Sequence, residues 1–185
     1  VHLLDDFSIG GTCARTHMFT EVLSHMFVPK GIHKVIFSKE VDLGNIGIVN
    51  ELPLTDHRHL AYKWYQNSEH HGFFVPVPQD HTSVTDAFID MKYSEEMYHV
   101  YATVPQDVNF LLEANGNQLN VTFTNGTTIE NTQEYVTMIE AMLLSAKSFG
   151  FDAVLFQNVN ESIDYYDLSK PVPVPDSSNP IIINP

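Results

Sequence analysis

The stretch from Asn131 to Asn160 constrains the fold most, because every local signal in it agrees. Its apolar residues recur every three or four positions, which places one continuous stripe along a helix. These residues are Tyr135, Met138, Ile139, Met142, Leu143, Ala146 and Phe149. Asn131 can cap the first turn with Glu134 completing a capping box, and Gly150 can end the helix in a left-handed conformation. The apolar run 153–156 then predicts a strand buried on both faces.

The rest of the chain alternates short strands with a few helices, which predicts an α+β fold. We expect mixed, short-stranded sheets with about three to five helices packed around them. The 185 residues are enough for one domain, 1–185, with one core and no metal or disulfide support. Residues 161–180 are acidic and then proline-rich, which predicts a surface loop or arm. No internal repeat is visible.

Local patterns give the expected elements along the chain. Helices are expected at 18–27, at 55–67, after Thr82-Ser83, and as a single turn opened by Pro105. Strands are expected at 32–37, 46–49, 98–104, 119–123 and 181–183, with 73–78 confined by its prolines to an edge or a loop. Asn125-Gly126 predicts a hairpin turn.

The formal charge of −14 makes nucleic acid an unfavourable partner, because binding phosphates needs clustered Lys and Arg. The acidic residues either form an ordinary solubilising surface or imitate nucleic acid and occupy a basic partner. The longest apolar run is too short to cross a bilayer, so we expect a soluble protein without a membrane partner. Cys13 cannot form an internal disulfide. No signal peptide is visible, and Val1 in place of Met indicates a processed or excerpted chain.

Several residues invite a chemical interpretation and also have a structural one. The pairs His57/His59 and His70/His71 lack the spacing of converging ligands, so we predict no metal site. Cys13 fits a small core residue better than a nucleophile. The common nucleotide, phosphate and hydrolase fingerprints are absent. An aromatic cluster could stack on a planar ligand or fill the core. It comprises Tyr62, Trp64, Tyr65, Phe73 and Phe74.

The segment 146–158, AKSFGFDAVLFQN, resembles the late helix and strand of ADP-ribosyltransferase-like domains of phage and bacterial effectors. Residues 98–107 and 179–185 are similar to the middle strand and the final Asn-Pro strand of that family. The resemblance implies a pocket for NAD. It implies His33 as the first-strand residue, Tyr62 or Tyr65 as the stacking aromatic, and Gln157 at a position where relatives carry a carboxylate. Tyr62 and Phe73, with His33, are then the cofactor-binding candidates.

Two hypotheses follow from different classes of protein. The first is an ADP-ribosyltransferase-like enzyme of viral or mobile-element origin, which modifies a host protein in the host cytoplasm or from the virion. The second is a non-enzymatic acidic protein, either a virion component or an inhibitor that occupies a basic partner surface. Gln157 and the chain end at Pro185 lack the carboxylate that the enzyme needs, which favours the second hypothesis. The helix-to-strand motif at 146–158 favours the first, which we take as the main expectation.

Overall fold

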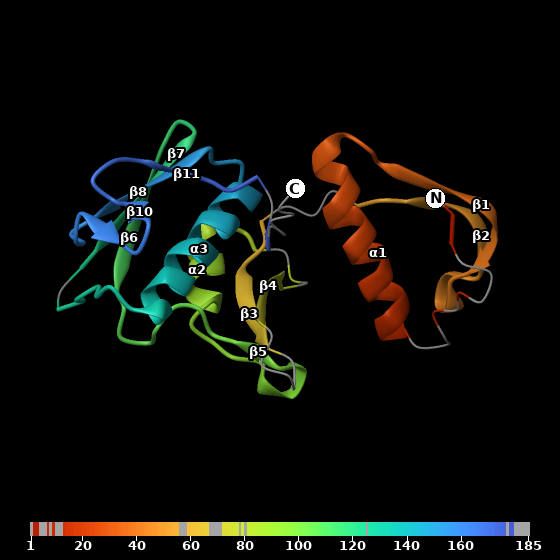
Figure 1. Cartoon of the computed structure of the whole chain (residues 1–185), viewed down its shortest axis with the longest axis horizontal. Helices are drawn as coiled ribbons and strands as arrows, with labels where there is room; N and C mark the ends of the chain where they lie inside the picture. Colours follow the sequence, from red (N-terminus) through yellow and green to blue (C-terminus); the bar gives the residue numbers. More distant parts are fainter. Residues whose placement is uncertain are drawn as a thin grey trace, which may run out of the picture. The chain divides into compact units, whose positions relative to one another are not determined.

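The chain divides into unit 1, Val1–His57, and unit 2, Arg58–Pro185. The structure is a computed structural model, and it describes residues 2, 3, 7, 9, 13–55, 59–66, 72–77, 79, 81–124, 126–176 and 178–179. Each unit has its own cluster of buried apolar residues, so the expectation of one shared core is wrong. The α+β class is confirmed, since helices pack against several small sheets (Figure 1). The assignment of residues 1–185 to one domain stays a prediction.

Unit 1 is a helix packed on a β-hairpin. Its elements are α1 (Cys13–Phe27), the 3-10 turns η1 (Val28–Lys30) and η2 (Gly44–Ile46), and strands β1 (Lys34–Asp42) and β2 (Ile48–Pro53). The strands pair antiparallel, with an irregularity between Ile36 and Val41. Leu23 of α1 is buried with Val35 and Phe37 of β1. The helix therefore begins five residues before the predicted start at 18, and both predicted strands exist with shifted bounds.

Unit 2 contains a four-stranded sheet of order β11-β8-β7-β6 and a three-stranded sheet of order β4-β3-β5. Its strands are β3 (Tyr62–Gln66), β4 (Gly72–Pro76), β5 (Val100–Tyr101), β6 (Phe110–Asn115), β7 (Gln118–Phe123), β8 (Ala153–Gln157), β9 (Ser162–Ile163), β10 (Tyr166–Asp167) and β11 (Val172–Pro173). Its helices are α2 (Val84–Asp90), the 3-10 turn η3 (Glu96–Tyr98) and α3 (Gln133–Ser148). β7 and β8 run parallel, joined by α3, and the small pair β9–β10 is antiparallel.

The helix and strand predicted at 131–160 are present as α3 and β8. Gly150 has φ of 87°, the left-handed conformation that ends a helix without a Cβ penalty. The predicted capping box is wrong, because the N-cap is Thr132 and its side chain makes no capping bond. Asn131 instead accepts a hydrogen bond from the backbone N–H of Asp164, 2.9 Å away. β8 is buried at Val154 and Phe156.

Three other local predictions are wrong. Residues 62–66 form strand β3, because this aromatic run pairs with β4 across the sheet instead of forming the predicted helix. Residues 110–115 form strand β6, where a helical turn was expected. The tight turn after β6 lies at Gly116-Asn117, since Asn115 pairs with Gln118. The next described element after β7 is α3 and not a hairpin strand, and Asn125 of the predicted Asn125-Gly126 turn lies outside the described residues.

The remaining predictions have mixed outcomes. β4 lies at a sheet edge as its prolines predict, and α2 begins after the N-cap Ser83. The strand expected at 98–104 is reduced to the two residues of β5. The stretch 161–180 includes β9, β10 and β11, with Ile163, Leu168 and Val172 buried. The strand predicted at 181–183 lies outside the described residues.

Candidate functional site

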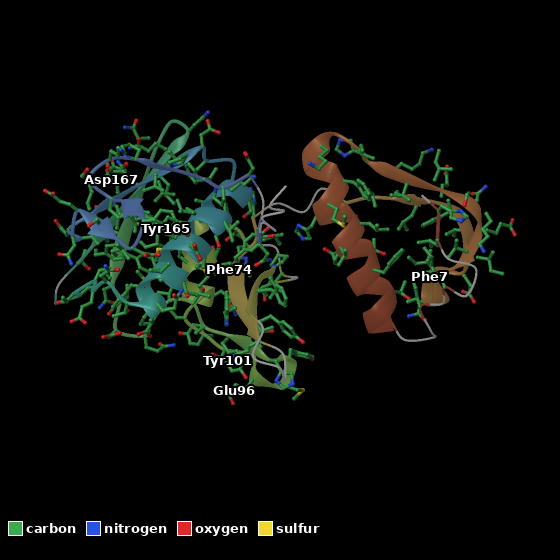
Figure 2. All side chains as sticks on the ribbon, viewed as in Figure 1. Phe7, Phe74, Glu96, Tyr101, Tyr165 and Asp167 are labelled. Atoms are coloured by element: carbon green, nitrogen blue, oxygen red, sulfur yellow. The ribbon has the colours of Figure 1, made fainter. Side chains whose placement is uncertain are left out.

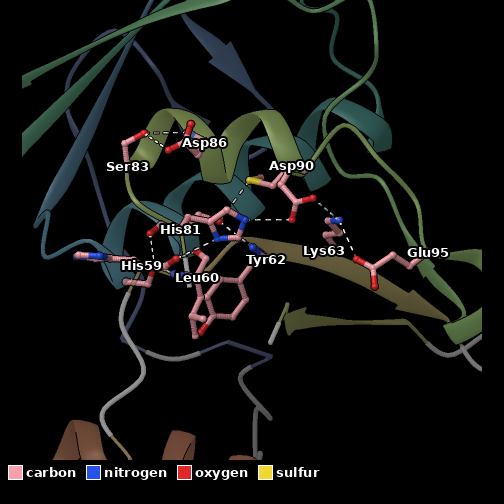
Figure 3. A network of polar contacts seen from close by, with 12 residues as sticks. His59, Leu60, Tyr62, Lys63, His81, Ser83, Asp86, Asp90 and Glu95 are labelled. Atoms are coloured by element: carbon pink, nitrogen blue, oxygen red, sulfur yellow. Dashed lines mark hydrogen bonds and ion pairs between the residues drawn. The ribbon is translucent and has the colours of Figure 1, made fainter. Parts of the chain in front are cut away.

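A charged network lies between β3 and α2 in unit 2, and Figure 3 shows it from close by. Lys63 is fully buried, and its Nζ lies 3.1 Å from Oδ1 of Asp90 and 3.1 Å from Oε1 of Glu95. The two carboxylates are only partly exposed, with side-chain exposures of 27% and 41%. A buried ammonium group is stable only when it is paired, so this lysine holds α2 and the following loop against β3.

His81 extends the same network. Its Nε2 lies 3.3 Å from Oδ2 of Asp90, and its Nδ1 lies 3.1 Å from the backbone carbonyl oxygen of His59. Both neighbours, the Asp90 carboxylate and the His59 carbonyl, are hydrogen-bond acceptors. The His81–Asp90 pair resembles an acid–base pair in its spacing. Because His81 is buried and both its nitrogens face internal acceptors, we interpret the network as a structural clamp.

The surface of unit 2 is strongly acidic. Its sequence contains sixteen Asp and Glu and only five Lys and Arg. Its four lysines are all engaged within the unit. Lys63 is in the clamp, and Lys170 lies 2.7 Å from Oδ2 of Asp167. Lys92 donates to the carbonyl oxygens of Gln106 and Val108, and Lys147 donates to those of Pro175 and Asp176. Among the described residues of unit 2, only Asp90, Glu95 and Asp167 therefore have a lysine as ion-pair partner.

Two groups of carboxylates surround tyrosine side chains in unit 2. Burial raises the pKa of Tyr135, and the nearby carboxylates of Asp107, Glu134 and Glu130 raise that pKa further. The hydroxyl of Tyr165 donates to Oε1 of Glu140 and lies 3.2 Å from the hydroxyl of Tyr166. We call these five carboxylates and three tyrosines the acidic surface: Asp107, Glu130, Glu134, Glu140, Asp164, Tyr135, Tyr165 and Tyr166.

The acidic surface is accessible. Four of its carboxylates are exposed, Glu140 is half-buried, and Tyr165 is 68% exposed. Figure 2 shows Tyr165 and Asp167 on the same unit. Burial, together with the hydrogen bond to Glu140, raises the pKa of Tyr165, and burial and its contact with Tyr165 also raise the pKa of Tyr166. The tyrosines therefore stay neutral at physiological pH and present rings and hydroxyls beside negative charges.

A shallow hollow of about 510 Å³ also opens on unit 2. Its lining comprises Thr85, Ile89, Lys92, Asn109, Phe110 and Thr124. The ammonium group of Lys92 lies 5.6 Å from the ring centroid of Phe110, within cation–π range. Because the same ammonium group donates to two backbone carbonyls, the hollow lacks a cation that is directed toward a ligand.

The structure places the predicted site residues in different elements. Tyr62 and Tyr65 lie on β3, and Phe73 lies on β4 directly opposite Tyr65. Gln157 ends β8 in the other sheet, where its Oε1 accepts a hydrogen bond from Thr122 at 2.7 Å. His33 belongs to unit 1, just before β1. The structure thus brings together only the β3 and β4 residues of unit 2, and the catalytic and cofactor roles of all five stay predictions.

Sequence reasoning missed the residues that carry the charged features. The clamp joins Lys63, His81, Asp90 and Glu95, which are spaced irregularly and meet only because β3 and α2 pack together.

The histidines considered as metal ligands form a separate case. His57, His70 and His71 lie outside the described residues. Among the residues that are described, no three His, Cys, Asp or Glu side chains come together as a metal site would require.

Comparisons with known proteins indicate the fold and a bacterial relative. The chain is 29% identical over 153 residues to the anti-sigma-X factor RsiX of Bacillus subtilis. This match covers 78% of this chain and 39% of that protein. The chain therefore spans about two fifths of the length of this relative. No protein-family model matches the chain. Within the described ranges, no helix is long and apolar enough to span a membrane.

These findings overturn the ADP-ribosyltransferase resemblance, and with it the viral origin and the modification of a host protein. The helix, glycine and buried strand that suggested it form a packing unit common to many folds. Binding of NAD and the predicted location stay predictions. The chain is also similar to the solved tandem GerMN domains of the sporulation protein GerM from Bacillus subtilis, with a TM-score of 0.59 and 14% identity. Since this match covers 91% of this chain and 70% of the other, the chain shares the fold of tandem GerMN domains.

Proposed function

We propose that this chain is a non-enzymatic protein-binding module whose acidic surface binds a basic partner protein. The observation that carries the proposal is the use of all four lysines of unit 2 in internal contacts, which leaves the acidic surface with a net negative field. Such a field attracts a positively charged partner and speeds its association.

The chemistry of the acidic surface suits Lys and Arg side chains. Carboxylates accept charge-assisted hydrogen bonds from these cations, and a neutral tyrosine ring attracts them through its π face. Tyrosine is also enriched at the centres of protein interfaces, because it adds large contact area at a small entropic cost. The exposed Tyr165 beside Glu140 offers both kinds of contact at one position.

The relative named as an anti-sigma factor favours a protein partner, because an anti-sigma factor acts on a sigma factor. This chain corresponds to only 39% of that relative, so a sigma factor as the partner of this chain is a second, narrower candidate. The binding experiment separates the two candidates by including a purified sigma factor of the source organism beside the partner that the chain captures.

The experiment uses two variants that carry the same change in charge. The test variant replaces Glu130, Glu134 and Glu140 by Gln, and the control variant replaces Glu40, Glu96 and Glu113, which are exposed elsewhere. Each chain is immobilised, and proteins retained from an extract of the source organism are identified by mass spectrometry. We expect a basic protein that the native chain and the control retain and that the test variant loses. Equal retention by both variants would contradict the proposal.

A further inference from the structure

The two units share a helix–turn–strand motif that local sequence patterns do not reveal. α1 and α3 each precede a left-handed glycine, Gly31 with φ of 77° and Gly150 with φ of 87°. In each unit the next strand begins three residues after this glycine. The first strand then buries a Val and a Phe two residues apart, Val35 and Phe37 in unit 1 and Val154 and Phe156 in unit 2.

The equivalence extends to the strand partners. Val35 pairs with Leu52 and Lys34 with Pro53 in unit 1, as Val154 pairs with Val172 and Ala153 with Pro173 in unit 2. The next backbone hydrogen bond is also the same. The N–H of Leu54 donates to the carbonyl of His33 at 2.9 Å, and the N–H of Val174 donates to that of Asp152 at 3.0 Å. Such agreement in register indicates a repeated structural unit, although no repeat is visible in the sequence.

The equivalence also extends ahead of the helices, at a spacing of 120 residues. His2 is hydrogen-bonded to Ser38 at 2.9 Å, and the corresponding Thr122 is hydrogen-bonded to Gln157. Ile9 and Ile129 are both buried. Unit 1 therefore corresponds to the part of unit 2 from about Thr122 to Val174. Among the described residues of unit 1, no element corresponds to β3, β4, α2 or β6.

In unit 2, β3, the residue Leu60 ahead of it and the end of α2 contact one side of α3. The N–H of Tyr62 donates to the hydroxyl of Ser145 and the N–H of Leu60 donates to that of Ser148, both at 2.9 Å. The hydroxyl of Ser145 also lies 3.4 Å from the sulfur of Met91, at the end of α2. Met142 and Ala146 on α3 are consequently fully buried.

In unit 1, the corresponding side of α1 is open. Val22 and Met26 stand 120 residues before Met142 and Ala146, one helical turn apart, and they are 50% and 55% exposed. The opposite side of α1 is buried at Leu23 and Ser24, as α3 is buried at Leu143 and Leu144. Apolar side chains therefore occupy exposed positions whose equivalents belong to the core of unit 2.

We propose that the face of α1 that carries Val22 and Met26, here the α1 outer face, docks a strand–helix segment of the same kind as Leu60–Met91. The full-length protein supplies this segment from outside residues 1–185. The match to tandem GerMN domains supports this occupant, because it leaves 30% of that chain without a counterpart here (the match covers 70%). The segment presents backbone N–H groups of an extended strand and apolar side chains of a short helix to α1.

Cysteine labelling in two proteins tests the proposal. Met26→Cys is placed in a Cys13→Ser background, in residues 1–185 and in the complete gene product, and its rate of maleimide modification is measured by mass spectrometry. Ile48→Cys is the matched control, because Ile48 is an exposed apolar residue on β2, 70% exposed. We expect Met26→Cys to react at least about tenfold more slowly in the complete protein, because modification then requires local opening, while the control reacts equally in both.

Equal rates for Met26→Cys in the two proteins would overturn the proposal. Slow modification of Met26→Cys that is already present in residues 1–185 would also overturn the proposal. If this protection depends on protein concentration, it would assign the α1 outer face to a second copy of the chain. If it does not, it would assign that face to unit 2. A second variant keeps the test independent of labelling. Val22→Asp is expected to leave the melting temperature of residues 1–185 unchanged and to lower that of the complete protein, and equal shifts in both would count against the docked segment.

Discussion

Replacing Lys63 by Met tests the charged clamp between β3 and α2. Methionine preserves most of the apolar stem of the lysine, so the change removes mainly the ammonium group. At 3.1 Å, each ion pair is worth about 5 kcal/mol of attraction at an effective dielectric constant near 20, before the cost of desolvation. Removing one partner of a buried pair typically costs about 3–5 kcal/mol, because the other charge stays behind unpaired. Since Asp90 and Glu95 retain some contact with water, we expect a loss at the lower end, about 3 kcal/mol.

The assay is equilibrium unfolding in urea, with the free energy of unfolding extrapolated to water. Lys170→Met is the matched control, because its ion pair with Asp167 is exposed, and we expect a loss below about 0.5 kcal/mol. Adding Asp90→Asn and Glu95→Gln to Lys63→Met should recover much of the stability, because no unpaired charge then remains in the clamp. A loss of less than about 1 kcal/mol for Lys63→Met, or no recovery in the triple variant, would refute the clamp.

Three further predictions concern individual contacts. Gly72→Ala should lower the free energy of unfolding by about 1–3 kcal/mol, since a Cβ at position 72 would lie 1.9 Å from the Trp64 ring. The fluorescence of Trp64, the only tryptophan, should shift as well, and an unchanged spectrum would contradict this. Burial raises the pKa of Tyr62 to about 12, so the stability that Tyr62 contributes is complete below pH 10 and falls as the pH rises to 12. In Tyr62→Phe, the free energy of unfolding measured in urea should therefore change less between pH 10 and pH 12. Hydrogen bonds from Lys170 and Ser169 lower the pKa of Asp167 to about 2, so its contribution is present above pH 3.8 and is lost as pH falls; Lys170→Met should raise this pKa in a carboxyl NMR titration.

Local sequence patterns predicted the elements whose formation depends on their own residues. α3 has a long apolar period and a glycine stop, and β7 alternates strictly, so both were placed correctly. β3 was misplaced, because Leu60, Ala61, Trp64 and Tyr65 also fit a helical period. Its actual structure depends on pairing with β4 and β5, which the local window does not contain.

Long-range features were not predictable from one sequence. The repeat of units 1 and 2 rests on a glycine, two buried strand residues and a matching register, with few identical residues to reveal it. The clamp needs Lys63 and Asp90 to meet across 27 residues of chain. The negative charge was visible, but its distribution was not, because that depends on which lysines the fold uses internally.

The salt dependence of partner binding tests the central claim most directly. The dissociation constant of the captured partner is measured by calorimetry at several salt concentrations for the native chain, for the variant with Gln at 130, 134 and 140, and for the charge-matched control. We predict that binding of the native chain and the control weakens steeply with salt, and that the test variant binds more weakly with a shallower dependence. Binding that is insensitive to salt, or identical for the test variant and the control, would contradict a partner held by the acidic surface.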